Sequence, residues 1–81
     1  MLSFEERIAI AAKTLNISEE DATKYSYLPE NCDGIFVSVP EKGGGSVIVD
    51  PNGGFLFLSS FYGYDDCIEK YLAGERTNPD K

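Results

Sequence analysis

Residues 46–59 read SVIVDPNGGFLFLS, and this stretch decides the fold of the chain. Its two ends, 46–49 and 55–59, are rich in β-branched and aromatic residues, which are typical of strands. The DPNG segment between them is a turn signal, because Pro51 presets the first central dihedral angle and Gly53 accepts a positive φ. A connection this short makes the two strands antiparallel neighbours. The stretch therefore predicts a β-hairpin.

A third strand is predicted just before the hairpin, over residues 35–39, which read IFVSV. Pro40 and the glycines at 43–45 separate it from the hairpin, so the three strands form an antiparallel meander. Apolar residues fall on both faces of these strands, whereas a sheet with one solvated face shows a cleaner alternation. Either helices cover both faces, or one apolar face is left for a partner or a second copy of the chain.

Two helices are predicted before the sheet, and residues 2–28 together form a helical hairpin. Ser3 and Glu6 have the spacing of a capping box, and apolar residues recur every three or four positions as far as Leu15. Asn16 is a suitable left-handed stop. Ser18 begins a second helix, which we expect to end by residue 27 because of the proline at 29.

A last helix is predicted over residues 64–74, followed by a loose polar tail at 75–81. Asp65 or Asp66 can cap its start, and Gly74 can end it. The prediction is thus one α+β domain over residues 1–81, with the order α-α-β-β-β-α. The expected core is Ile8, Leu15, Val37, Val47, Val49, Phe55, Phe57, Ile68 and Leu72.

The charge balance narrows the classes of partner. The chain has 14 acidic and 7 basic residues, and its net charge is −7. Binding to phosphate backbones requires clustered Lys and Arg, which the sequence lacks, so direct contact with nucleic acid or an anionic membrane is disfavoured. A basic protein partner fits this charge, although an acidic surface also serves solubility alone.

The segment from Ala11 to Tyr25 resembles a helix-turn-helix. In that motif the first residues of the second helix approach the bases of DNA. Here those residues are Glu19, Glu20 and Asp21, and their carboxylates would repel phosphate. We therefore interpret the segment as a helical hairpin, and a transcription-associated regulator stays the alternative function.

The residue types needed for common catalytic sites are scarce. Histidine is absent, which removes the commonest general base and the usual catalytic zinc ligand. Cys32 and Cys67 cannot complete a thiolate zinc site alone. The chain starts without a secretory signal and has no apolar run of membrane length, so we expect a cytoplasmic protein with reduced thiols. We expect no enzyme activity, cofactor or metal.

The segment 62–66 is the candidate site for a partner. Tyr62 and Tyr64 combine large contact area with a polar tip, and Asp65 and Asp66 beside them could receive Lys or Arg. Alternatively, the tyrosines pack on the sheet and the acids cap the helix. The sequence therefore predicts a small protein-binding module, an inhibitor or immunity-type protein acting on a basic partner, with a homodimer as another outcome.

Overall fold

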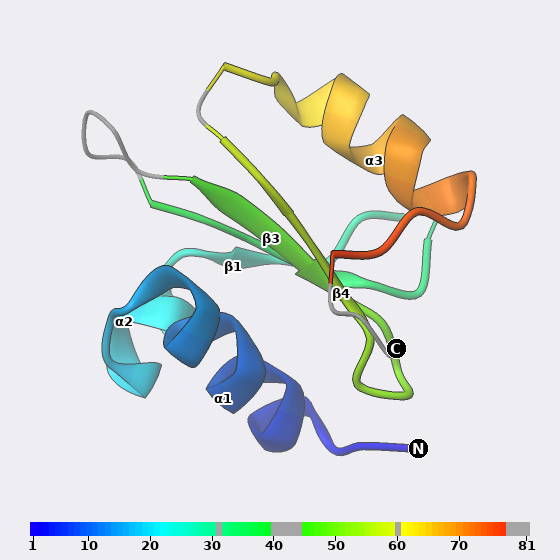
Figure 1. Cartoon of the computed structure of the whole chain (residues 1–81). Coiled ribbons are helices and arrows are strands. Elements are labelled where there is room, and N and C mark those ends of the chain that lie inside the picture. The colour runs from blue at the N-terminus through cyan, green and yellow to red at the C-terminus, as the bar shows by residue number, and fades with distance from the viewer. Residues whose placement is uncertain (31, 40–44, 60, 78–81) are drawn as a thin grey trace.

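The computed structural model describes residues 1–30, 32–39, 45–59 and 61–77 and has three layers. A four-stranded sheet lies between two helices on one face and a third helix on the other (Figure 1). The α+β class is confirmed, with one strand more than predicted. The elements are α1 (Phe4–Leu15), α2 (Glu19–Lys24), β1 (Ser26–Tyr27), β2 (Ile35–Ser38), β3 (Ser46–Val49), β4 (Phe55–Leu58) and α3 (Tyr64–Leu72).

The sheet is an antiparallel meander in the order β1-β2-β3-β4, as predicted for its last three strands. The prediction of three strands is corrected by β1, which pairs Tyr27 with Phe36. This strand falls inside the predicted helical hairpin. Pro29 explains why the helix does not continue to residue 28, since a proline disfavours helix in the residue before it. Two residues are too few to show the alternation by which a strand is recognised.

The ends of α1 confirm the capping signals read from the sequence. The Ser3 side chain accepts a hydrogen bond of 3.1 Å from the Glu6 amide, and the Glu6 side chain accepts one of 2.8 Å from the Ser3 amide. Asn16 is left-handed, with φ 59°. The chain then reverses direction, and the Ile17 amide donates a hydrogen bond of 2.9 Å to the Ala12 carbonyl. Polar local signals thus set both limits of the helix.

The start of α3 differs from the prediction. Gly63 is its N-cap and makes no side-chain cap bond, while Asp65 and Asp66 lie in the first turn. Carboxylates there still favour the positive end of the helix dipole. Gly74 ends the helix with φ 93°, as predicted, and its amide donates to the Tyr71 carbonyl at 3.0 Å.

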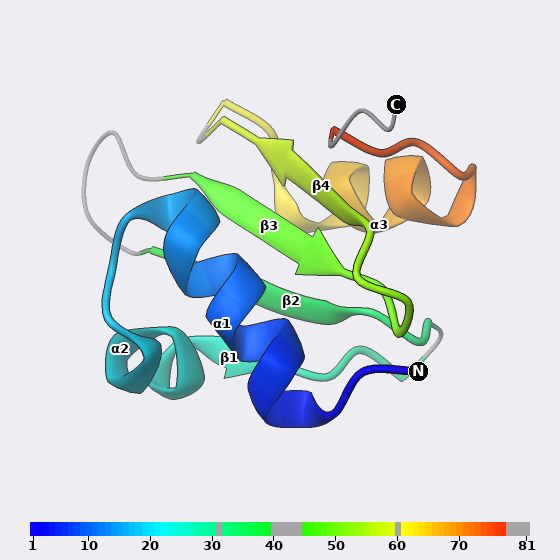
Figure 2. The same cartoon turned by 60° about the horizontal axis from the view of Figure 1, so that its bottom comes forward.

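The two faces of the sheet form separate cores. Helices α1 and α2 cover one face, and α3 lies on the opposite face (Figure 2). The buried residues of the first core are Ile8, Ala11, Ala12, Ala22, Ile35, Val37, Val47 and Val49. Those of the second are Phe36, Ile48, Leu56, Cys67 and Tyr71. Two alternatives were predicted for the sheet, and the one in which helices cover both faces is correct.

Two residues of the predicted core are at the surface. Phe57 is 39% exposed and Leu72 is 57% exposed, because Phe57 lies on an edge strand and Leu72 on the last turn of α3. Ile8, Val37, Val47 and Val49 are buried as predicted.

The start of the predicted loose tail is tied to the sheet. The Thr77 amide donates to the Phe55 carbonyl at 2.7 Å, and the Phe57 amide donates to the Thr77 hydroxyl at 2.7 Å. Residues 78–81 lie outside the described residues, as does the predicted glycine loop except for Gly45.

Candidate functional site

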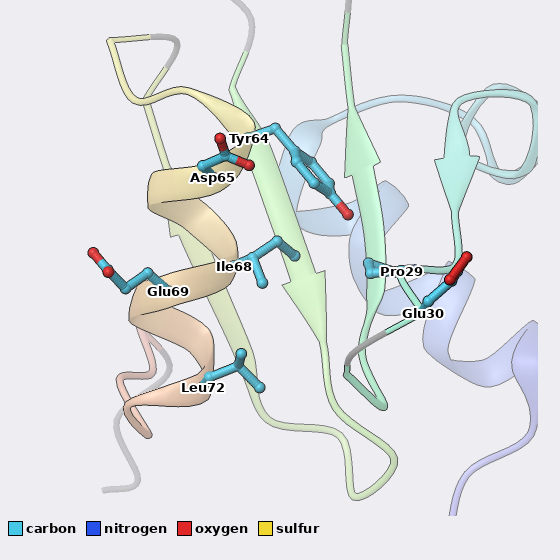
Figure 3. A pocket seen from close by; sticks show the side chains of 7 residues that line it. All are labelled: Pro29, Glu30, Tyr64, Asp65, Ile68, Glu69 and Leu72. Carbon is cyan, nitrogen blue, oxygen red and sulfur yellow. The ribbon is translucent and has the colours of Figure 1, made fainter.

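A groove lies on the α3 face of the sheet, between α3 and the segment that follows β1 (Figure 3). Its volume is about 330 Å³. The lining residues are Pro29, Glu30, Tyr64, Asp65, Ile68, Glu69 and Leu72. Two segments that are distant in the sequence therefore form its two walls.

One wall is the side of α3 that carries an apolar row. Residues four apart lie on the same side of a helix, so Tyr64, Ile68 and Leu72 form an apolar row. By the same spacing, Asp65 and Glu69 lie on the neighbouring side of α3, and the Glu69 side chain points away from the groove in Figure 3. Leu72 is 57% exposed and Tyr64 is 41% exposed, so the apolar row remains accessible along its length.

The opposite wall contributes a third carboxylate. Pro29 is buried and Glu30 is exposed, directly after the sheet's short edge strand. The lining residues thus include three acids, Glu30, Asp65 and Glu69, and no base. Such a surface attracts cationic groups and presents apolar area beside them.

Tyr64 reaches from α3 over the sheet to β1 and β2. Its ring is edge-on to Phe36, with centroids 4.9 Å apart, and edge-on to Tyr27 at 5.8 Å. Loss of hydration, with the groups around it including Asp65, raises the pKa of the Tyr64 hydroxyl. The hydroxyl is therefore protonated at neutral pH and can donate a hydrogen bond at the groove.

The structure separates the four predicted site residues. Tyr64 and Asp65 line the groove, whereas Tyr62 and Asp66 do not. Tyr62 is 37% exposed, contacts the ring of Phe61 at 5.6 Å and has the Lys70 ammonium 5.6 Å from its centroid. Asp66 is exposed in the first turn of α3.

Sequence reasoning missed most of the lining. Glu69 and Leu72 could have been found from the four-residue spacing that relates them to Asp65 and Ile68. Glu30 had no such signal, because only the pairing of β1 with β2 brings its segment onto this face.

A polar network fixes the end of the molecule beside the groove. The Tyr71 hydroxyl donates to Oδ1 of Asp33 at 2.7 Å, and the Arg76 guanidinium lies 4.1 Å from the Tyr71 ring centroid. Arg76 also pairs with Asp50 at 2.9 Å. These contacts join α3, the loop before β2, the β3–β4 turn and the residues after α3.

A second hollow lies between α1 and α2, on the other side of the sheet. It is lined by Phe4, Glu5, Ile8, Glu19, Glu20 and Thr23. The helix-turn-helix-like segment forms α1 and α2, and the exposed residues at the start of α2 are the acids named above. This surface is therefore acidic where a DNA reader would approach the bases.

Both cysteines are free thiols on the α3 side of the sheet. Burial, with a smaller contribution from the charge of Asp66, raises the pKa of the Cys67 thiol, so this group is a poor nucleophile at neutral pH. Within the described ranges, no group of three or more metal-ligating side chains is assembled. None of the helices in the described part of the chain has the length and apolar character of a membrane span.

Comparisons with family models, curated proteins and solved structures give no match for this chain.

Proposed function

We propose that this chain is a non-catalytic protein-binding module that recognises a basic partner through the groove beside α3. The observation that carries the proposal is the composition of the lining: beside an accessible apolar row it includes three acidic residues and no basic one. Apolar contact supplies affinity, and the carboxylates select and steer a cationic surface. A cytoplasmic inhibitor or immunity-type protein is the form of this function that we favour.

The chemistry of the groove does not favour catalysis. The chain has no histidine, and its groove offers exposed carboxylates. A carboxylate acts as an acid catalyst near neutral pH only where burial raises its pKa. Recognition of a cation needs no such shift, since an ordinary carboxylate is charged at neutral pH.

The regulator hypothesis is the weaker alternative. It needs the hairpin of residues 11–25 to approach DNA, yet the exposed start of α2 carries Glu19, Glu20 and Asp21. Phosphate contact depends on Lys and Arg, and these acids oppose it. Retention on a DNA column at moderate salt would favour the regulator.

A capture experiment with two matched variants tests the function. Asp65→Asn with Glu69→Gln removes two of the three carboxylates that line the groove, and Glu19→Gln with Glu20→Gln makes the same change in net charge on the opposite side. Each protein is immobilised and exposed to extract from the native cell, and the retained proteins are identified and purified for titration.

We expect a basic protein that binds the wild type and the α2 variant alike. Its affinity for the groove variant should fall by about 5- to 30-fold, the usual loss when interfacial charge pairs are weakened. Equal weakening by both variants would show that net charge alone drives binding, and would contradict the proposal. Binding lost only in the α2 variant would move the site to the hairpin.

A further inference from the structure

The turn between β3 and β4 joins an asparagine to a glycine, Asn52 to Gly53. Asparagine is one of the chemically labile residues of proteins. Its side-chain amide can be attacked by the backbone nitrogen of the next residue, which closes a succinimide ring. A side chain on that next residue hinders the approach, and glycine has none. The pair therefore has the composition needed for loss of the amide, and the folded structure decides whether the reaction can occur.

The structure leaves the side-chain amide of Asn52 accessible. Asn52 is exposed, in a turn that lies at the end of the sheet near the N-terminal segment (Figure 2). The side chain that organises this turn is that of Asp50, whose Oδ1 accepts hydrogen bonds from the main-chain amides of Asn52 at 2.9 Å and Gly54 at 2.8 Å. Within the described residues, no hydrogen bond restrains the Asn52 side chain itself. Its amide carbon is thus free to turn toward the main chain.

The attacking nitrogen, that of Gly53, is held by one weak contact. The Gly53 amide donates to the Asp50 carbonyl at 3.1 Å, near the long end of the usual range, and Gly53 is partly exposed. Attack requires this hydrogen bond to open, so that the nitrogen can lose its proton. Opening of one bond in an exposed turn needs a local fluctuation and not unfolding of the domain.

A second pair of the same kind is protected by packing. Asp33 precedes Gly34, and an aspartate can close the same ring with loss of water. Gly34, however, is buried, and a Cβ atom there would meet Ile48 and Tyr71. The Asp33 carboxylate is also engaged, since it accepts the hydrogen bond of 2.7 Å from the Tyr71 hydroxyl. The fold therefore exposes one of the two reactive pairs and restrains the other.

We propose that Asn52 is a site of spontaneous deamidation in the folded protein. The Gly53 nitrogen forms a bond to Cγ of Asn52 and gives up its proton, the Cγ–Nδ2 bond breaks, and ammonia leaves. Water then opens the succinimide at one of its two carbonyl carbons. Opening at Cγ gives aspartate, and opening at the main-chain carbon gives isoaspartate, in which the main chain runs through the side-chain carbons. Water is the co-reactant, and no group is oxidised or reduced.

The isoaspartate product should loosen the contact that holds the residues after α3. Asp50 accepts the turn amides through Oδ1 and the Arg76 guanidinium through Oδ2, the latter at 2.9 Å. Isoaspartate adds a methylene group to the main chain between Asp50 and Gly54, so the amides that Oδ1 accepts change their spacing, and the geometry that serves both oxygens is lost. Since Arg76 precedes Thr77, which bonds β4, the modification weakens the attachment of this segment as well.

The reaction is tested on the full chain. Wild type is kept folded at neutral and at mildly alkaline pH, and samples taken over time are digested for mass spectrometry, with an isoaspartyl methyltransferase to label isoaspartate. Asn16 is the internal control, since it is exposed too but precedes Ile17, whose branched side chain hinders ring closure. Asn52→Gln is the control variant, because its longer side chain disfavours the ring. Circular dichroism establishes that each fresh protein is folded.

The peptide that contains Asn52 should gain an acid in place of the amide, with isoaspartate among the products and a rate that rises with hydroxide concentration. Asn16 should react at least about tenfold more slowly, which corresponds to ~1.4 kcal/mol in the activation barrier. Isoaspartate at Asp33 should form only in chains unfolded in urea. An Asn52 that stays intact in the folded chain, although it reacts in urea, would show that the turn protects it and would overturn the proposal.

The stability of aged samples tests the link to Asp50. After equal incubation, wild type should unfold at a lower urea concentration than Asn52→Gln, whereas the two fresh proteins should unfold alike. The fraction of chains with the lowered midpoint should match the isoaspartate content. Equal midpoints in spite of deamidation would overturn the coupling to the Asp50–Arg76 pair. These outcomes do not depend on the groove, so they leave the proposed function to its own test.

Discussion

The hydroxyl of Tyr71 on α3 donates a hydrogen bond of 2.7 Å to Oδ1 of Asp33, which lies 38 residues earlier in the loop before β2. Burial, with this hydrogen bond and the negative charge of Asp33, raises the pKa of Tyr71, so the phenol stays protonated and the bond persists through the neutral range. The bond ties α3 to the segment between β1 and β2, which also contributes Pro29 and Glu30 to the groove.

Removal of this bond should lower the stability of the domain. We expect Tyr71→Phe to reduce the free energy of unfolding by about 1.5 kcal/mol, the lower end of the range for hydrogen bonds to charged groups, because Asp33 is exposed. Urea denaturation followed by circular dichroism measures it. Tyr62→Phe, at a more exposed ring, is the control and should change stability by less than about 0.5 kcal/mol. Equal destabilisation by the two variants would show that the Tyr71 hydroxyl contributes no more to stability than an exposed one.

Gly34 is required by the close approach of α3 to the sheet. A Cβ atom at this buried position would lie 2.9 Å from Cζ of Tyr71 and would also meet Ile48. Overpacking of this kind typically costs about 1–3 kcal/mol, so we expect Gly34→Ala to lower the denaturation midpoint accordingly. An unchanged midpoint would show that the Tyr71 ring moves aside freely.

The two glycines that flank α3 should respond oppositely to the same substitution. Gly63 is an N-cap in extended conformation with open space around it, so Gly63→Ser supplies the missing cap and should stabilise by about 0.3–1 kcal/mol. Gly74 has φ 93°, and Gly74→Ser should destabilise by about 1 kcal/mol. Thermal denaturation of both variants checks the prediction, which fails if the two shifts share a sign.

The Asp50–Arg76 pair should make stability sensitive to acid. Partial burial would raise the pKa of Asp50, but hydrogen bonds from Arg76 and from the amides of Asn52 and Gly54 outweigh it and hold the pKa below its usual value. Because the folded pKa is depressed, this stabilisation is complete above the unfolded pKa of about 3.9 and is lost as pH falls through the folded pKa.

The variant Asp50→Asn should therefore be destabilised by about 1.5–3 kcal/mol at pH 7, the range for hydrogen bonds to charged groups. The difference from wild type should shrink as the pH falls below about 4. Urea denaturation across this range measures it, with Glu20→Gln as an exposed control. A difference that stays constant with pH would contradict the ionic origin.

The two thiols should differ in reactivity. Cys67 is buried and its thiol pKa is raised, while Cys32 is partly exposed. An aromatic disulfide reagent should therefore modify one thiol per native chain at neutral pH and two after denaturation. Cys32→Ser should abolish the native reaction, whereas rapid modification in that variant would place Cys67 at the surface.

Local signals in the sequence were sufficient for much of the fold. The capping box at Ser3, the left-handed Asn16 and the DPNG turn each act within a few residues, and the structure confirms all three, with Gly53 at φ 99°. β1 was missed because its two residues become a strand only by pairing with β2. A pattern within a segment cannot report a contact that another segment provides.

The candidate site was only partly predictable for the same reason. Tyr62 and Tyr64 are two residues apart and of one type, yet only Tyr64 contacts Phe36 and lines the groove. Their difference depends on where α3 begins, and the sequence placed the cap at Asp65 or Asp66 instead of Gly63. Glu30 enters the site through the chain reversal at β1, which no local spacing reveals.

The hydrogen bonds between Thr77 and β4 protect one edge of the sheet, so truncation before Thr77 should affect aggregation. The strand they protect reads FLFL, and an unprotected apolar edge of this kind recruits further strands from other molecules. A chain cut after residue 76 would keep Arg76 and the seven described elements but lose this guard, and we expect it to self-associate into insoluble aggregates. Thr77 thus helps to keep the chain soluble, and it is not among the residues that line the groove proposed to bind a partner.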